Sequence, residues 1–376
     1  MHMPVFSSHT CQCLLALTLP LFCIAEPVLA EDKPAPLDKM LWSRSMGQSG
    51  LRRFYSTDAD LGEVLNRQSS YLLANRLETS TKASTKSNFV DPQVLASSVE
   101  SYVGQFDSLL PVAGNQEHLW LLRTLVRTAQ RLEIDKVQSR NNRYDLGMLY
   151  VPDQNSYFGL GLAMENTSAT LRYTTGQTDV QAVGPRLDAG FRITPLLALG
   201  VRIEQLRFTG DNAVAARGTS VTRPLDYQRN YIQVESILRL SPQQLHWLPA
   251  GSQLGASAAV YLLDSRYQPE LNSLGQAVTE PFGNHEHLKI MRTGIFYSTT
   301  LAGNTKWNPY TELLLDREFD TNMSHPLDDR TGLIWKAGLA WLPAPGKRIS
   351  LEYQRSQSRH DLRERDNFLV VAIFDF

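Results

Sequence analysis

The sequence predicts a mainly β fold in which about twelve antiparallel strands close into a barrel, preceded by a small α-helical region. Two patterns lead to this prediction: apolar and polar residues alternate from about residue 143 to the C-terminus, and the connections between the alternating segments mostly alternate between short and long. The bulk composition, with 42% hydrophobic and 20% charged residues, is that of an ordinary soluble protein. A barrel is compatible with these averages, because each strand carries one apolar and one polar face.

Residues 1–30 are typical of a secretory signal peptide, although they carry no lysine or arginine before the apolar run. Residues 14–25 form that run, and Val28 and Ala30 supply small residues before a cleavage site at Glu31. All three cysteines lie inside this segment, at Cys11, Cys13 and Cys23. The exported chain is therefore expected to lack disulfides and thiolate sites, which suits passage through the oxidising periplasm.

Three classes of protein are disfavoured by composition and hydropathy. The formal net charge of −1 argues against a nucleic-acid-binding protein, which usually carries a clear basic excess. No segment after the signal approaches 18 consecutive apolar residues, so no transmembrane helix is expected. The lack of cysteines excludes cysteine-based metal sites, and no metal or other cofactor is expected.

Residues 31–142 are predicted to be a helical region, in the periplasm or plugging the barrel. Apolar residues recur at intervals of three and four in residues 61–73. Asp91 and Pro92 resemble a helix start, followed by the same spacing to Phe106. A third helix is expected over residues 116–137, carrying a basic stripe at Arg123, Arg127 and Arg131. This stripe is either an ordinary solvated face or a contact with acidic lumen residues or anionic cargo.

Residues 143–376 are predicted to form the barrel. Leu187, Ala189 and Phe191, for example, alternate with Asp188 and Gly190. Segments of about ten residues have the length that a tilted strand needs to cross a bilayer. Twelve strands are expected, beginning near Tyr144, Tyr157, Thr167, Gly184, Leu196, Asn230, Gln253, Leu288, Asn308, Arg330, Arg348 and Asn367.

The expected connections alternate between short turns, such as 165–166 and 194–195, and long loops, such as 209–229 and 264–287. Transmembrane barrels have short periplasmic turns and long external loops. Two connections depart from this order, the short 152–156 and the longer 241–252. An even number of strands would place both ends of the barrel, and the helical region, in the periplasm.

The last residues alternate up to the C-terminus, with apolar side chains at Phe368, Val370, Ala372, Phe374 and Phe376. This segment resembles the terminal strand of Gram-negative outer-membrane β-barrel proteins, with Phe368, Phe374 and Phe376 as the assembly signal. The resemblance implies export by the Sec route, an outer-membrane location, and the membrane lipid and the barrel-assembly machinery as partners.

The candidate functional residues are charged side chains expected to face the lumen: Arg172, Arg186, Asp188, Arg192, Arg202, Glu204, Glu235, Arg239, Lys336 and Glu352. Charged rings in a pore set its selectivity. Alternatively, opposite charges pair across the interior and hold the barrel rigid. Six basic and four acidic members predict a mild preference for anions.

Histidines supply two weaker hypotheses. A hydrolase site at the barrel rim would need one of His246, His285, His287, His325 or His360 beside a serine and an acid. No catalytic motif known from outer-membrane hydrolases is present, so no catalytic residue is assigned. His285 and His287 would lie on one side of a strand, but a third metal ligand is lacking.

The leading functional prediction is an outer-membrane pore or export conduit, not an enzyme. Its N-terminal region would gate or plug the lumen, or receive a translocated substrate from a periplasmic export partner. The alternatives are an autotransporter-like translocator, a surface-anchored adhesive barrel that uses loops 209–229 and 264–287, and an outer-membrane hydrolase.

Overall fold

The computed structural model describes residues 97–375 apart from short stretches in the connections. Those stretches are residues 115–118, 134–136, 154, 172–175, 217–218, 276–283, 302–303, 305, 323–329, 345–346 and 359–362. The predicted signal peptide and residues 31–96 lie outside the described residues. No helix in the described part of the chain is long and apolar enough to cross a membrane.

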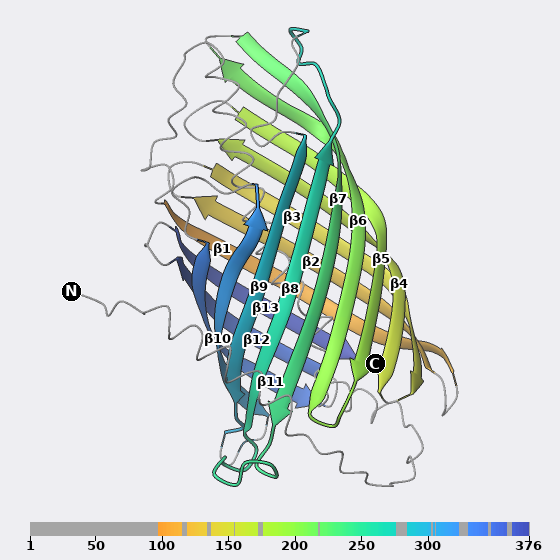
Figure 1. Cartoon of the computed structure of the whole chain (residues 1–376), viewed down its shortest axis with the longest axis vertical. Helices are drawn as coiled ribbons and strands as arrows, with labels where there is room; N and C mark the ends of the chain where they lie inside the picture. Colours follow the sequence, from red (N-terminus) through yellow and green to blue (C-terminus); the bar gives the residue numbers. More distant parts are fainter. Residues whose placement is uncertain are drawn as a thin grey trace, which may run out of the picture. The chain divides into compact units, whose positions relative to one another are not determined.

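The described residues form thirteen strands that close into one barrel (Figure 1). They are β1 (Ser97–Gly114), β2 (Leu119–Glu133), β3 (Val137–Asp153), β4 (Ser156–Leu171), β5 (Gly176–Arg192), β6 (Leu197–Ala216), β7 (Thr219–Leu240), β8 (Gln253–Tyr267), β9 (His285–Ser298), β10 (Trp307–Thr321), β11 (Thr331–Ala344), β12 (Lys347–Ser358) and β13 (Arg363–Asp375). Each strand pairs with its sequence neighbours in antiparallel fashion. The prediction of a closed antiparallel barrel is confirmed, except at the closure.

The barrel closes through a parallel pair, β1 with β13. Ser97 pairs with Arg363, and Leu109 pairs with Asp375. The sequence predicted an even number of strands, with the last strand pairing to the strand near Tyr144, and this is wrong. An odd number of strands in an up-and-down barrel makes the first and last strands run the same way, so β1 begins at the end opposite to where β13 finishes.

The helices predicted over residues 91–106 and 116–137 are wrong where the structure describes them, because β1 and β2 occupy those residues. The reason is visible in β2. Leu121 and Leu125 are buried on its inward face, whereas Trp120 and Val126 are exposed on its outward face. When both faces of a strand are apolar, the alternation disappears and spacings of three and four arise by chance.

The expected strand beginning near Thr167 does not exist, because β4 continues from Ser156 to Leu171. The expected turn at residues 165–166 therefore lies inside a strand. Without it, the short connection after Asp153 falls at the same end as the turn at residues 193–196 and the C-terminus of β13. We call this the periplasmic end, because short turns face the periplasm in outer-membrane barrels, and we call the opposite end the outer end.

An apolar belt surrounds the outward face of the barrel. Its side chains are exposed and apolar, including Tyr102, Phe106, Leu146, Phe158, Leu160, Leu162, Leu187, Ile203, Leu313, Trp335, Leu339, Leu351, Phe368 and Val370. Trp307 and Trp341 stand at its periplasmic edge with ring centroids 6.3 Å apart, a position typical of interfacial anchors. A closed barrel with an outward apolar belt confirms the predicted outer-membrane β-barrel.

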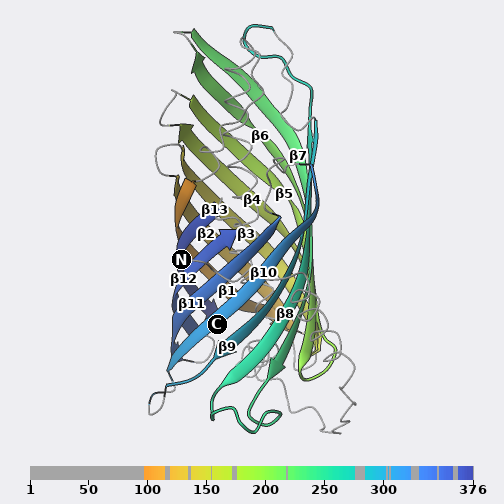
Figure 2. The same ribbon diagram turned by 60° about the vertical axis from the view of Figure 1, so that its left-hand side comes forward.

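Several strands continue beyond the belt at the outer end. In β6 the outward residues after Ile203 are polar, beginning with Gln205 and Arg207. The residues from Gln205 to Ala216 add about 30 Å along the barrel axis, at about 3.3 Å per residue and about 40° of tilt. Both views show β6 and β7 reaching beyond their neighbours (Figures 1 and 2). Most of the loop predicted over residues 209–229 is thus an extended hairpin.

Candidate functional site: the inward wall of the barrel

The structure places nine of the ten predicted lumen residues on the inward face, and the tenth, Arg172, lies outside the described residues. Five are buried, namely Arg186, Arg202, Glu204, Glu235 and Lys336. Four are half-buried, namely Asp188, Arg192, Arg239 and Glu352. The inward placement follows from the two-residue period of a strand. The residues next to each of these side chains are mostly apolar and point outward into the belt. Their role in selectivity stays a prediction.

The inward wall of β3 to β7 changes character with height. An apolar tier lies at the periplasmic end, a charged tier lies above it, and a second apolar tier follows toward the outer end. We define the charged tier as the residues Arg143, Asp145, Glu165, Arg186, Asp188, Arg202, Glu204 and Arg229. Four arginines and four carboxylates give it a formal charge of zero.

Arg143 on β3 stands at the centre of the charged tier. Its Nη1 donates to Glu204 Oε1 at 3.2 Å, and its Nη2 binds the second oxygen of the same carboxylate. Arg229 on β7 donates to Glu165 Oε2 at 2.9 Å. The other oxygen of Glu165 accepts a bond from Asn141 at 2.9 Å. The contacts join residues up to 64 positions apart, so the tier ties several strands together.

Arg186 on β5 organises the second half of the charged tier. Its Nε donates to Asp188 Oδ2 at 2.7 Å, and its Nη1 binds Asp145 on β3. Arg202 on β6 donates to Asp188 Oδ1 at 3.0 Å. Arg143 Nε lies 3.1 Å from Asp145 Oδ1, which links the two halves into one network. Each carboxylate of the tier is therefore held by at least one arginine.

The pairing decides what the charged tier contributes. Buried charges are costly unless they are paired and hydrogen-bonded, and these are. A neutral network also adds no net charge to the lumen. Structural pairing across the wall is therefore what the geometry of this tier supports, while the anion preference predicted from the sequence stays a prediction.

Strands outside β3 to β7 carry smaller ion pairs on their inward faces. Arg292 on β9 donates two hydrogen bonds to Asp316 on β10, of 2.6 and 2.8 Å. Lys336 Nζ on β11 lies 3.6 Å from Glu312 Oε2. On the inward face of β2, Arg123 Nε lies 3.8 Å from Asp107 Oδ1. The basic stripe that was predicted on a helix therefore lies in part on a strand, because residues four positions apart share a face in a helix and in a strand.

Sequence reasoning missed half of the charged tier, namely Arg143, Asp145, Glu165 and Arg229. Glu165 was expected in a turn, and Arg229 at the end of a long loop. Arg143 and Asp145 precede the alternating run of β3 and share the parity of the buried Leu149. Extending that parity backwards would have identified both as inward residues.

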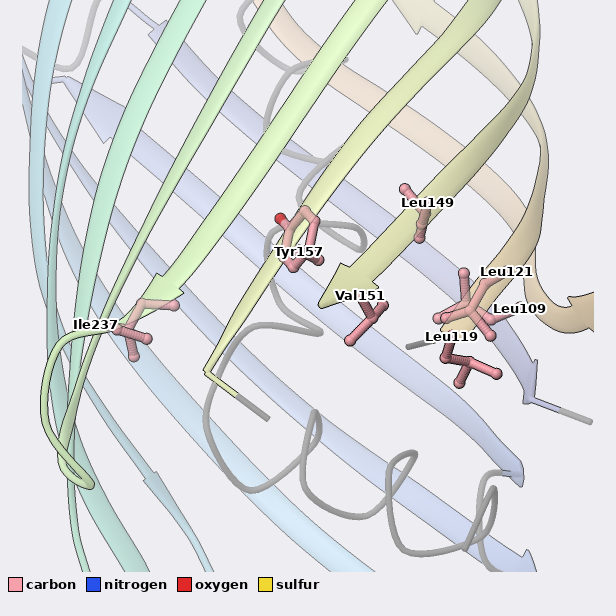
Figure 3. Close-up of a cluster of buried hydrophobic side chains, with 8 residues drawn as sticks. Leu109, Leu119, Leu121, Leu149, Val151, Tyr157 and Ile237 are labelled. Atoms are coloured by element: carbon pink, nitrogen blue, oxygen red, sulfur yellow. The ribbon is translucent and has the colours of Figure 1, made fainter. Parts of the chain in front are cut away.

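The apolar tier at the periplasmic end is drawn in Figure 3. Its members are Leu109, Leu119, Leu121, Leu149, Val151, Tyr157, Ala198 and Ile237. They come from six strands, β1 to β4, β6 and β7. None is more than 8% exposed. These side chains form a buried apolar surface at the periplasmic end of the inward wall.

Three aromatic rings on the inward wall lie against glycines of neighbouring strands. A Cβ added at Gly190 would lie 2.1 Å from the Tyr157 ring, one at Gly255 2.1 Å from the Phe296 ring, and one at Gly338 2.3 Å from the Tyr310 ring. Tyr310 also donates to Glu352 at 2.8 Å. Glycine lets each ring lie flat on the wall, which leaves space in the lumen and favours curvature.

The second apolar tier lies toward the outer end, on the extensions of β5 to β7. Leu206, Phe208 and Leu225 are buried in it. The Phe208 ring stacks on Tyr227 with centroids 4.5 Å apart, and Tyr227 packs against Tyr267 at 4.7 Å. Tyr227 and Tyr267 fall in segments expected to be loops, so no sequence pattern predicted this tier.

Two of the candidate histidines, His285 and His287, lie beside aspartates in the described part of the chain, and His325 and His360 lie outside it. His285 pairs with Asp264, and His287 Nε2 lies 3.1 Å from Asp320 Oδ1. Lys289 and His287 together lower the pKa of Asp320. Neither ring contacts a serine hydroxyl in the described part of the chain, and no three His, Cys, Asp or Glu side chains gather there as a metal site.

Comparison with known proteins gives similarities of fold. No family model and no curated protein matches the chain. Among solved structures, the β domain of the Bordetella autotransporter BrkA is 16% identical, with a TM-score of 0.47 over 68% of this chain and 96% of that one. The translocator domain of the autotransporter NalP from Neisseria meningitidis is 11% identical, with a TM-score of 0.45 over 78% and 92%.

A Pseudomonas aeruginosa FadL homologue is 11% identical, with a TM-score of 0.43 over 67% of this chain and 69% of that one. The closed barrel and its apolar belt, rather than these distant similarities, define the class. The chain has the architecture of a membrane-spanning β-barrel.

Proposed function

We propose that this protein is an outer-membrane conduit, a pore or an export channel, whose lumen is occupied at rest by residues 31–96. The observation that carries the proposal is the inward wall, which is charged at one height and apolar, yet buried, at the periplasmic end. Eight-stranded barrels are filled by their own side chains, whereas barrels of sixteen strands leave an aqueous channel. Thirteen strands lie between these limits and leave room for a chain segment.

The parallel closure supports this arrangement. Because β1 begins at the outer end, the chain before Ser97 must reach that end, either through the lumen or over the cell surface. From Ser97 to Leu109, β1 descends about 30 Å toward the apolar tier at about 3.3 Å per residue and about 40° of tilt. Residues 74–96 span about 35 Å even as a helix, so the apolar stretch at residues 61–73 can reach the tier.

A second candidate is an autotransporter-like translocator or adhesive barrel that presents residues 31–96 at the cell surface. The same parallel closure favours it, because a segment that ends at the outer mouth is well placed for display. An enzymatic role is not proposed, since the ring nitrogens of the described histidines His285 and His287 bind aspartates.

Single-channel conductance tests the conduit. We expect small or no current from the chain beginning at residue 31, and a large steady current from residues 97–376, which keep all thirteen strands. A full-length Leu65→Asp variant should show intermediate, flickering current, because a charge opposes packing on the apolar tier. Absence of current from all three proteins, with folding shown by heat-modifiable gel mobility, would exclude a conduit.

Surface proteolysis of intact cells separates the two candidates. A protease site inserted in the Ser/Thr/Lys segment at residues 79–87 should resist cleavage if residues 31–96 fill the lumen. Rapid cleavage, with release of the N-terminal fragment into the medium, would favour the translocator or adhesive barrel instead.

A further inference from the structure

Basic side chains gather on the outward face of β8, β9 and β10, directly beyond the apolar belt at the outer end. We call this group the cationic patch: Arg266, His285, His287, Lys289 and Arg317. On β8 the belt ends at Leu262, and on β10 it ends at Leu315, two residues before Arg317. Outward side chains at this height face the lipid headgroups rather than the hydrocarbon.

The strand register brings these residues together. Arg266 pairs with His285, and Lys289 pairs with Leu262 on one side and Asp320 on the other. Arg317 pairs with Met291, two positions from Lys289 on the same face. Side chains on one face of adjacent strands at these positions lie within reach of one another. The patch is therefore one surface and not a set of scattered charges.

Two carboxylates lie within the patch, but the patch has more hydrogen-bond donors than these carboxylates bind. Asp264 is shared by Arg266 Nε, at 3.2 Å, and His285. Asp320 is shared by Lys289 Nζ, at 2.5 Å, and His287. Each carboxylate thus serves two donors. Arg317 forms no ion pair with any described residue.

The corresponding surface on β5 to β7 has the opposite character. There the outward side chains beyond the belt include Asp179, Asp211 and Asp226, with Arg207 as the basic member. Arg207 Nη2 forms an ion pair with Asp226 Oδ2, at 2.8 Å. Charge beyond the belt is thus distributed unevenly around the barrel, which an unselected solvated surface does not require.

An exposed aromatic side chain accompanies the patch. Phe319 is on the outward face of β10, next but one to Arg317, and is 50% exposed. Aromatic side chains near the headgroup level are typical of membrane interfaces. Phe319 lies farther from the belt than Arg317 and so faces the headgroup layer, while the belt edge at Leu262 and Leu315 lies on the other side of the cations. Cations bordered by an apolar edge match a ligand with both an anionic group and an apolar part.

From these observations we propose that the cationic patch binds the phosphate headgroup of an outer-leaflet lipid. Arg317, Lys289 and Arg266 would supply the charge-assisted hydrogen bonds to phosphate oxygens, and Leu262 and Leu315, at the edge of the belt, would contact the upper part of the acyl region. The site is independent of the lumen. It stands even if the conduit proposal fails.

Native mass spectrometry of the full exported chain tests the site, with diphosphoryl lipid A as the probe. The double variant Lys289→Gln/Arg317→Gln should bind it at least tenfold more weakly, at about fivefold for each cation removed. The single variant Arg266→Gln should bind it about fivefold more weakly. Its matched control is Arg207→Gln, because Arg207 and Arg266 are equally exposed, at 71%. The control should stay within twofold of the unmodified protein.

Two further arms identify the ligand. Monophosphoryl lipid A should bind more weakly than the diphosphoryl form if phosphate is recognised. Inorganic phosphate at millimolar concentration should not displace the lipid, and displacement would show a free-phosphate site instead. Equal losses in the double variant and the control would overturn the proposal, provided that both run as folded barrels in heat-modifiable gels.

Discussion

The charged tier and the periplasmic apolar tier lie on the same face of largely the same strands, yet their side chains are stabilised in different ways. Both tiers are buried to the same degree: Arg143 and Arg186 are each 2% exposed, and Leu121 and Leu149 are 2% and 1% exposed. Arg143 and Arg186 bind carboxylates on other strands of the barrel. The charged tier therefore depends on directional bonds within the wall, whereas the apolar tier depends only on the exclusion of water.

The largest effect is expected from breaking the charged tier at its centre. Arg143→Ala leaves Glu204 without its two-bond partner and should lower the free energy of unfolding by about 3–5 kcal/mol. Denaturant unfolding in detergent, followed by tryptophan fluorescence, measures this. A loss below 1 kcal/mol would mean that the lumen solvates these charges freely.

The apolar tier gives a smaller, conditional effect. Leu149→Ala should cost about 2–4 kcal/mol in the chain beginning at residue 31, because it opens a cavity under a covering segment. In residues 97–376 the same substitution should cost much less, since the side chain would already face water. Equal costs in both backgrounds would show that residues 31–96 do not cover this tier.

The contact between Tyr157 and Gly190 probes the wall at the border of the two tiers. Gly190→Val should destabilise the barrel by about 1–3 kcal/mol, because the new side chain meets the ring. Tyr157→Ala in the same protein should recover part of that loss. A double-mutant cycle measures the coupling, and strictly additive effects would argue against the contact.

The smallest effect is expected outside both tiers. Arg207→Ala removes an ion pair whose arginine is 71% exposed beyond the belt. Exposed pairs of this kind contribute little to the free energy of unfolding, and less at high salt. Unfolding at low and high ionic strength checks this, and a large loss that does not depend on salt would contradict the assigned exposure.

The sequence predicted the parts of the fold that depend on local period. Strands such as β8, and the outward placement of Phe368 and Phe374, follow from alternation alone and are confirmed. The same parity placed Arg186 and Glu204 inward. Phe376, also part of the assembly signal, lies outside the described residues.

The sequence-based prediction of secondary structure was wrong where the two faces of a strand are equally apolar. β1 and β2 line the apolar tier inside and the belt outside, so they carry apolar residues on both faces and imitate helices. Missing these two strands and splitting β4 into two changed the strand count from thirteen to twelve. The extra strand expected inside β4 made the count even, and so moved the expected start of the barrel from the outer end to the periplasmic end.

By itself, then, the sequence determined which residues face lipid and which face the lumen, because strand period is a local property that each segment expresses alone. Only the tertiary structure decided how many strands close the barrel, that β1 meets β13 in parallel, and which arginine holds which carboxylate. Those facts depend on residues many positions apart, as in Arg143 with Glu204. They arise from the closure of the sheet and have no signature in any one strand.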